Sequence, residues 1–191
     1  MRAGPLDMRM NTASPMDAAT FVNTASEKTL VEVFQDYGEE RFSRRIAKAI
    51  VQARATQPIL HTQVLAEIVK AAHPRWEKNK HPATRVFQAI RIYINRELED
   101  LKTGLKGALA LLAAGGRLVV ISFHSLEDRI VKRFMKTLSE GNAPPRGVPV
   151  RAAEIEVIFR SIGRAMKPTQ EELKRNVRAR SAVMRIGEKL A

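Results

Sequence analysis

The sequence predicts an α/β fold in which a block of helices precedes strands that alternate with helices. Three observations support this fold class. Apolar residues recur at helical spacing through most of the segment 15–72. A continuous apolar run over 118–123 lies between two helical patterns, as expected for a buried strand of a parallel sheet. Two later segments, 155–162 and 182–186, have the composition of further strands.

The helical block is predicted to hold three amphipathic helices. Ser26 can cap the first, because its hydroxyl can accept a hydrogen bond from a free N–H of the first turn. The second helix covers about 39–53, and Thr62 can cap the third. Residues 73–82 then form a basic connector bounded by two prolines.

A long helical pattern begins just after Pro82 and is expected to break into two helices at Gly104 and Gly107. The strand at 118–123 follows. A strand buried in a parallel sheet needs paired neighbours on both sides, and the later segments supply at most one. We therefore expect one edge of this strand to be bare and the chain to be part of a larger α/β domain.

The helix after this strand is expected to begin with a capping box in which Ser125 is the cap and Asp128 replaces the usual Glu. Residues 139–153 are expected to form a loop. Thr169 opens a second capping box, for a short helix that ends near Asn176.

The composition indicates a polyanionic partner. The chain has 33 Lys and Arg against 20 Asp and Glu, a formal net charge of +13. Cysteine is absent, which excludes a disulfide scaffold, a zinc–thiolate site and a thiol nucleophile. The four histidines lack metal-ligand spacing, and no apolar stretch is long enough to span a bilayer. We expect a soluble, intracellular protein with no metal site.

Three stretches are distinctive. Residues 4–10 read Gly-Pro-Leu-Asp-Met-Arg-Met, 81–92 read His-Pro-Ala-Thr-Arg-Val-Phe-Gln-Ala-Ile-Arg-Ile, and 122–132 read Ser-Phe-His-Ser-Leu-Glu-Asp-Arg-Ile-Val-Lys. Together, and with Arg-Ala-Arg-Ser at 178–181, they resemble the bacterial 16S rRNA (cytosine-N4) methyltransferase family. The resemblance covers nearly the whole chain.

This resemblance implies the back half of a Rossmann-like methyltransferase sheet with an inserted helical substrate-recognition domain. On this reading 1–11 is a loop of the methyltransferase domain, 12–80 is the insertion, and 81–191 is the C-terminal part of the methyltransferase domain. In the family, the glycine-rich loop that approaches the cofactor, S-adenosyl-L-methionine, lies before the segment that corresponds to Gly4. We therefore expect this chain to lack the cofactor-binding part, to be an incomplete fragment, and to be inactive alone.

Methylation of N4 of cytosine requires the amine to approach the sulfonium methyl group in line, so positioning should supply most of the rate. We expect His124 and Ser125 to line the target-base pocket, since ligands of open α/β sheets bind at the carboxyl ends of strands. Asp7 is the third candidate catalytic residue. The alternatives are that Ser125 only caps a helix, that His124 is a turn residue, and that Asp7 and Arg9 form a structural ion pair.

Phosphate contacts with RNA are expected from three basic groups. They are on the helix 39–54, around the proline-bounded connector and near the last strand: Arg41, Arg44, Arg45, Lys48, Lys80, His81, Arg85, Arg178 and Arg180. Arg54 extends the first group. The alternatives are a solvated helix face and cations that flank an edge strand. Trp76 can stack on an unpaired base or serve as a partly buried anchor.

The leading hypothesis is thus a cytoplasmic rRNA methyltransferase whose partner is small-subunit ribosomal RNA or the 30S subunit, with no membrane association. The composition alone would also suit a non-catalytic basic RNA- or ribosome-binding module. A helical DNA-binding regulator is a third hypothesis, but it leaves the strands unexplained.

Overall fold

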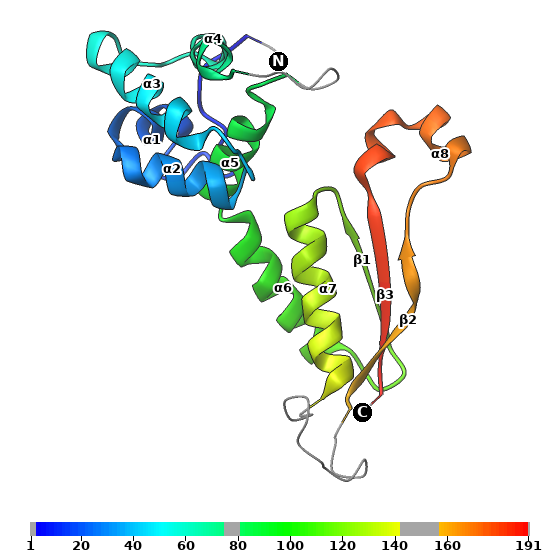
Figure 1. The fold of residues 1–191 in the computed structure, drawn as a ribbon. Helices are drawn as coiled ribbons and strands as arrows, with labels where there is room; N and C mark the ends of the chain where they lie inside the picture. Colours follow the sequence, from blue (N-terminus) through cyan, green and yellow to red (C-terminus); the bar gives the residue numbers. More distant parts are fainter. Residues whose placement is uncertain (1–2, 75–80, 142–156, 191) are drawn as a thin grey trace, which may run out of the picture. The chain divides into compact units, whose positions relative to one another are not determined.

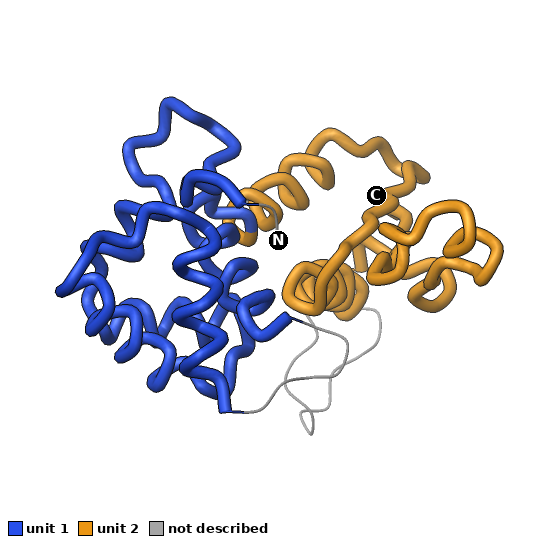
Figure 2. Tube along the Cα trace, turned by 90° about the horizontal axis from the view of Figure 1, so that it is seen from above, with its two compact units in different colours: residues 1–97 blue, residues 98–191 orange. Residues whose placement is uncertain are grey.

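The computed structural model describes residues 3–74, 81–141 and 157–190 (Figure 1). The chain divides into two compact units, Met1–Glu97 and Leu98–Ala191 (Figure 2). The first unit is helical and the second combines helices with a small sheet. The predicted division into a loop, an insertion from 12 to 80 and a C-terminal part stays a prediction about domain organisation.

The first unit consists of helices around one hydrophobic core. Its described helices are α1 (Ala18–Thr24), α2 (Glu27–Asp36), α3 (Ser43–Thr56), α4 (Thr62–Ala72) and α5 (Thr84–Asn95). Helix α2 packs against α3 and α5, and α3 packs against α4. Phe34 and Ile46 are fully buried between these helices. The helical block expected from the apolar spacing is confirmed.

Two of the predicted helix starts have different outcomes. The cap at Ser26 is confirmed, because the Thr29 N–H donates to the Ser26 hydroxyl at 3.0 Å. Thr62 is the first residue of α4 and not its cap, so that prediction was wrong. The Thr62 hydroxyl instead accepts from the Gly4 N–H at 3.1 Å and donates to the Gly4 carbonyl at 3.2 Å. It fastens the start of the chain to α4.

Helix α3 begins four residues later than the predicted start at residue 39. Glu39 has a left-handed backbone, with φ of 48°, which a helix start cannot accommodate. The buried Glu40 carboxylate accepts from the Phe42 N–H at 2.9 Å, while the Glu40 N–H donates to the Phe34 carbonyl at 3.0 Å. These bonds turn the chain before the helix can start.

The helical pattern after Pro82 breaks at Arg96, not at the glycines. Arg96 has φ of 51° and ends α5 in the left-handed conformation. The next helix, α6 (Glu97–Leu111), runs through both Gly104 and Gly107. Each of those glycines costs helix propensity, but neither breaks the backbone hydrogen bonding of a helix.

The second unit contains a three-stranded sheet of β1 (Arg117–Ser122), β2 (Phe159–Met166) and β3 (Val183–Lys189). The strand order is β1-β3-β2, and both pairs are antiparallel, so β1 and β2 run parallel with β3 reversed between them. Helices α6 and α7 (Ser125–Glu140) lie on one side of this sheet (Figure 1). The short helix α8 (Gln170–Arg175) and a 3₁₀ turn, η2 (Val177–Ser181), connect β2 to β3.

Strand β1 is an edge strand among the residues that the structure describes, since β3 is its only partner there. The expected bare edge is therefore confirmed. Leu118 and Val120 pack into the cluster with α6 and α7, whereas Val119 and Ile121 are 52% and 54% exposed on the other face. The expectation of a strand within a parallel sheet and buried on both faces is wrong for this chain, because nothing in the described ranges covers the second face.

The remaining elements are those predicted from the sequence, but the bounds of some are shifted along the chain. The last strand is confirmed as β3, and its antiparallel partner lies at 159–166 instead of 155–162. Thr169 caps α8 as predicted, accepting from the Glu172 N–H at 3.2 Å. Most of the predicted loop 139–153 lies outside the described residues, and α7 continues to Glu140.

Candidate functional site

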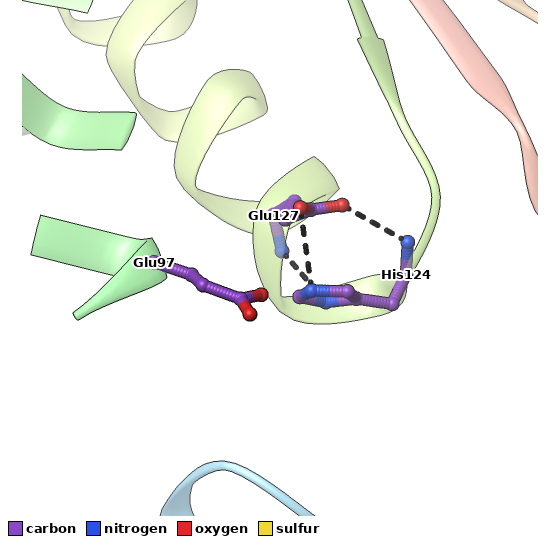
Figure 3. A group of neighbouring side chains, drawn as sticks. All are labelled: Glu97, His124 and Glu127. Atoms are coloured by element: carbon purple, nitrogen blue, oxygen red, sulfur yellow. Dashed lines mark hydrogen bonds and ion pairs between the residues drawn. The ribbon is translucent and has the colours of Figure 1, made fainter. Parts of the chain in front are cut away.

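The turn after β1 contains two of the predicted catalytic residues. His124 is the N-cap of α7, and Ser125 is its first residue. The Glu127 N–H donates to His124 Nδ1 at 3.4 Å, and the Glu127 carboxylate accepts from the His124 N–H at 3.2 Å (Figure 3). The same carboxylate accepts from the Phe123 N–H at 2.8 Å. The capping box is thus His124 with Glu127. The predicted box of Ser125 with Asp128 was one residue out of register.

This cap leaves the His124 side chain only 12% exposed, with Nε2 3.4 Å from the Glu127 carboxylate. The ring therefore has a structural role at the start of α7. Glu97, also drawn in Figure 3, belongs to the first unit, where Arg91 donates to both of its carboxylate oxygens at 2.7 and 2.8 Å.

Asp128 has a different partner. Arg185 of β3 donates to its two carboxylate oxygens at 2.7 and 2.9 Å. This hydrogen bonding lowers the pKa of Asp128 and raises that of Arg185. Sequence reasoning missed the pair. The signal was an arginine in the middle of an apolar strand, since a partly buried charge in a sheet requires an opposite charge nearby.

A cavity of about 200 Å³ lies beside the end of β1, on the face away from α7. Its apolar lining includes Ile121, Phe123, Met166 and Met184, and neither His124 nor Ser125 is among the described residues that line it. That His124 and Ser125 line the target-base pocket therefore stays a prediction.

Asp7 and Arg9 form a bidentate ion pair in the loop before α1. Arg9 Nε and Nη2 donate to the two Asp7 oxygens at 2.7 and 2.8 Å, and Arg9 Nη1 donates to the carbonyls of Thr12 and Ser14. The hydrogen bonds from Arg9 lower the pKa of Asp7 to about 2. At neutral pH the Asp7 carboxylate is an ionised acceptor that orients Arg9, so it cannot donate a proton.

The same loop is held from the other side by Asn95, the last residue of α5. Asn95 Oδ1 accepts from the Met10 N–H at 2.7 Å, and Asn95 Nδ2 donates to the Met8 carbonyl at 2.8 Å. Met8 lies in the left-handed region, with φ of 64°, so this clamp fixes a strained backbone. No sequence signal identifies Asn95, because a lone asparagine near a helix end is common.

The basic face predicted on α3 is present. Arg44, Arg45 and Lys48 are exposed, as is Arg41 just before the helix, while Ile46 and Ile50 face the core. None of these four cations forms an ion pair with another residue in the described ranges. Arg54 is half-buried, and its Nη1 donates to the Val22 carbonyl at 2.7 Å, so its place in the row stays a prediction.

The other predicted RNA contacts are scattered. His81 is exposed and its Nδ1 accepts from the Ala83 N–H at 3.2 Å, and Arg85 is half-buried. Arg178 and Arg180 are exposed on η2. Lys80 and Trp76 lie outside the described residues. Contact of these residues with RNA stays a prediction.

Comparison with known proteins places the chain among methylases. A model of the MraW methylase family matches residues 1–190, and the chain belongs to that family. The resemblance stated from the three motifs is thereby confirmed at the family level. No helix in the described ranges has the length and apolar character needed to cross a bilayer.

The curated relatives share one name. The chain is 60% identical over 191 residues to "Ribosomal RNA small subunit methyltransferase H" of Legionella pneumophila (strain Paris), covering 100% of this chain and 62% of that protein. The protein of the same name from Marinomonas sp. (strain MWYL1) is 56% identical, with 61% of its length covered. That from Pseudoalteromonas atlantica is 54% identical, with 62% covered. The chain therefore spans about three fifths of each of these relatives.

Proposed function

We propose that this chain is part of an S-adenosylmethionine-dependent methyltransferase that modifies N4 of a cytosine in small-subunit (16S) ribosomal RNA. The observation that carries the proposal is the 60% identity, along the whole chain, to a protein named as a small-subunit rRNA methyltransferase. The activity belongs to the longer protein, since the chain covers 62% of that relative.

The sheet supports a fold that continues beyond this chain. A parallel pair with an antiparallel strand between them fits the end of a Rossmann-like methyltransferase sheet. The bare edge of β1 is what an interior strand presents without its next neighbour, and the exposed Val119 and Ile121 are what its face presents without a covering layer of helices. We propose that the remainder of the family sequence pairs with this edge, and that residues 12–80 form the inserted substrate-recognition domain.

The described residues do not fit the cofactor. A nucleotide cofactor approaches the backbone at a glycine-rich turn after a strand. Here β1 is followed by Phe123 and His124, and β2 by Lys167 and Pro168. We assign cofactor binding to the part of the family sequence that this chain does not cover.

The target amine needs positioning more than activation, because its attack on a methyl group forms no covalent adduct with the enzyme. Asp7, held ionised by Arg9, is suited to orient a polar partner. His124 and Ser125 lie at the carboxyl end of β1, where ligands of such sheets bind. We propose His124 and Ser125 as contacts of the target cytosine, and Asp7 of the first unit as a separate candidate catalytic residue.

RNA binding is assigned to the exposed cations. Arg44, Arg45 and Lys48 lie on the solvent-facing side of α3, Arg41 lies just before that helix, and Arg178 and Arg180 lie on η2. Contacts from Arg and Lys to phosphates hold an RNA in register without reading its bases. The substrate would be ribosomal RNA or the 30S subunit, and the enzyme would work in the cytoplasm.

The test is a chimera that joins the uncovered part of the Legionella protein to this chain. It is incubated with labelled S-adenosylmethionine and 30S subunits that lack the modification, and the digested RNA is analysed by mass spectrometry. We expect N4-methylcytidine from the chimera and none from this chain alone. A methyl group on another atom, or no product while the intact Legionella protein is active, contradicts the proposal.

The second candidate is a non-catalytic RNA-binding module, which the net charge of +13 and the unpaired basic face of α3 favour. It predicts salt-dependent RNA binding by this chain with no methyl transfer by the chimera. Binding together with transfer identifies the methyltransferase.

A further inference from the structure

A second surface cavity, of about 260 Å³, lies in the second unit between α7 and the strands β2 and β3. It is distinct from the turn at His124. Its polar lining comes from three elements and includes Lys132, Lys136, Ser161, Arg164, Arg185 and Glu140. We propose that this cavity binds a phosphate group of the RNA backbone; the RNA source rests on the proposed function.

The cavity has an excess of positive charge. Lys136 lies 3.4 Å from the Glu140 carboxylate, and Arg185 is held by Asp128. Within the described part of the chain, Lys132 and Arg164 have neither an ion pair nor a hydrogen bond. Four cations therefore face two carboxylates, which leaves two positive charges for a ligand.

The carboxylates do not cancel this excess. Asp128 already accepts both guanidinium bonds of Arg185, and the charge of Lys132 adds a smaller effect that also lowers the Asp128 pKa. Glu140 and Lys136 are both exposed, and such pairs contribute little in water. An arriving anion therefore meets Lys132 and Arg164 as its main partners.

The backbone of β2 is irregular at this point. Ile162 pairs with Ile186 and Met166 pairs with Met184, so three residues of β2 lie opposite Arg185 alone. Gly163 takes φ of 67°, which favours glycine, and the bulge directs Arg164 to the cavity. Bulges of this kind re-aim side chains next to functional sites.

A phosphate group matches this set of donors. Its tetrahedral oxygens can accept from a guanidinium, an ammonium group and the exposed Ser161 hydroxyl at the same time. The backbone of a structured RNA offers such groups without any sequence requirement. The net charge of +13 adds a long-range attraction for the same polyanion.

The experiment measures binding of a fluorescent small-subunit rRNA hairpin to this chain by anisotropy, over a range of salt concentrations. The test variant carries Lys132→Gln and Arg164→Gln. The matched control carries Lys102→Gln and Lys106→Gln, two exposed lysines of α6 that remove the same charge from the same unit. Circular dichroism melts show whether each variant is folded.

We expect the test variant to bind about tenfold more weakly. Its slope of log affinity against log salt should be shallower by about 1. The control should change little. Equal losses in the two variants overturn the site, because net charge alone then accounts for binding. If the test variant is misfolded, the single variants Arg164→Lys and Arg164→Gln replace it. RNA affinity at the wild-type level in Arg164→Lys, together with weaker RNA binding by Arg164→Gln, supports the site.

A second arm separates RNA from free phosphate. Inorganic phosphate and the hairpin are each titrated into ¹⁵N-labelled chain, and the amide signals of 161–165 are followed. Shifts with the hairpin at micromolar concentration support the proposal, whereas shifts with inorganic phosphate only overturn it. If the chimera methylates 30S subunits and the double variant binds RNA normally, the site fails and the proposed function stands. If the chimera methylates nothing and the double variant binds RNA more weakly, the phosphate site stands and the proposed function fails.

Discussion

Asp128 of α7 and Arg185 of β3 are joined by two short hydrogen bonds, at 2.7 and 2.9 Å. The pair fastens the only long helix that follows β1, in the described part of the second unit, to the central strand of the sheet. Both side chains are about one-fifth exposed, so the pair is partly screened from water.

Substitution Asp128→Asn should destabilise the second unit by about 1–3 kcal/mol, because the guanidinium then loses a charged acceptor. Urea unfolding followed by amide exchange in β3 measures the loss. Asp100→Asn, at a residue of α6 without a bidentate arginine partner in the described ranges, is the matched control and should change stability by less than about 0.5 kcal/mol. A similar loss in both variants argues against a specific role for the pair.

The same carboxylate makes the stability of the second unit depend on pH. The hydrogen bonds from Arg185 lower the pKa of Asp128 in the folded state. A group of this kind contributes stability that is fully present above its unfolded pKa, about 3.9, and is lost as the pH falls through its folded pKa. We expect the wild-type stability to fall below about pH 4 more steeply than that of Asp128→Asn. Parallel pH profiles would contradict this.

Asp7 gives a direct titration test. Its pKa is about 2 because Arg9 donates to both of its oxygens. Side-chain carboxyl ¹³C shifts should place the midpoint near 2 in the wild type. In Arg9→Met the midpoint should return toward about 3.9. A midpoint that does not move would show that Arg9 leaves this carboxyl unchanged in solution.

Asn95→Ala should release the backbone of residues 8–10, since it removes one donor and one acceptor from that loop. We expect a cost of about 1–2 kcal/mol and faster amide exchange at Met10. Asn95→Asp keeps the acceptor for the Met10 N–H and loses the donor to the Met8 carbonyl. Amide exchange at Met10 in this variant should therefore be faster than in the wild type and slower than in Asn95→Ala. Identical exchange in all three chains would exclude the clamp.

The two faces of β1 should respond differently to polar substitution. Ile121 is 54% exposed in this chain, so Ile121→Thr should cost less than about 0.5 kcal/mol here. In the chimera with the uncovered part of the Legionella protein, it should cost about 2 kcal/mol, because the face is then covered. Val120→Thr, on the face packed against α7, is the control and should destabilise both chains. Equal costs for Ile121→Thr in the two chains would contradict coverage of this face.

Local patterns in the sequence predicted most elements, because the caps at Ser26 and Thr169 and the apolar run of β1 depend on nearby residues. The errors arose where distant contacts decide the structure. The break at Arg96 adjoins Asn95, which binds the loop at Met8 and Met10, about 87 and 85 residues away along the chain. No local propensity shows such a contact.

In the candidate site, too, the features set by nearby residues were predictable and those set by distant contacts were not. The exposed cations of α3 follow directly from its helical period, and the structure has them where the sequence puts them. The partners of Asp7 and His124 are local too. The sequence offered the ion pair of Asp7 with Arg9 as an alternative, but it gave the cap to Ser125 instead of His124. The bond between Asp128 and Arg185 spans 57 residues, so only the folded sheet reveals it.

We propose that β1 is an interior strand of the family's sheet, and that its next neighbour lies in the part of the relatives that this chain does not cover. Amide hydrogen exchange along residues 117–122 tests it, in this chain and in the chimera with the Legionella protein. The amides on the edge away from β3 should exchange freely in this chain and become protected by at least about 100-fold in the chimera. Equal protection in the two proteins would contradict the claim.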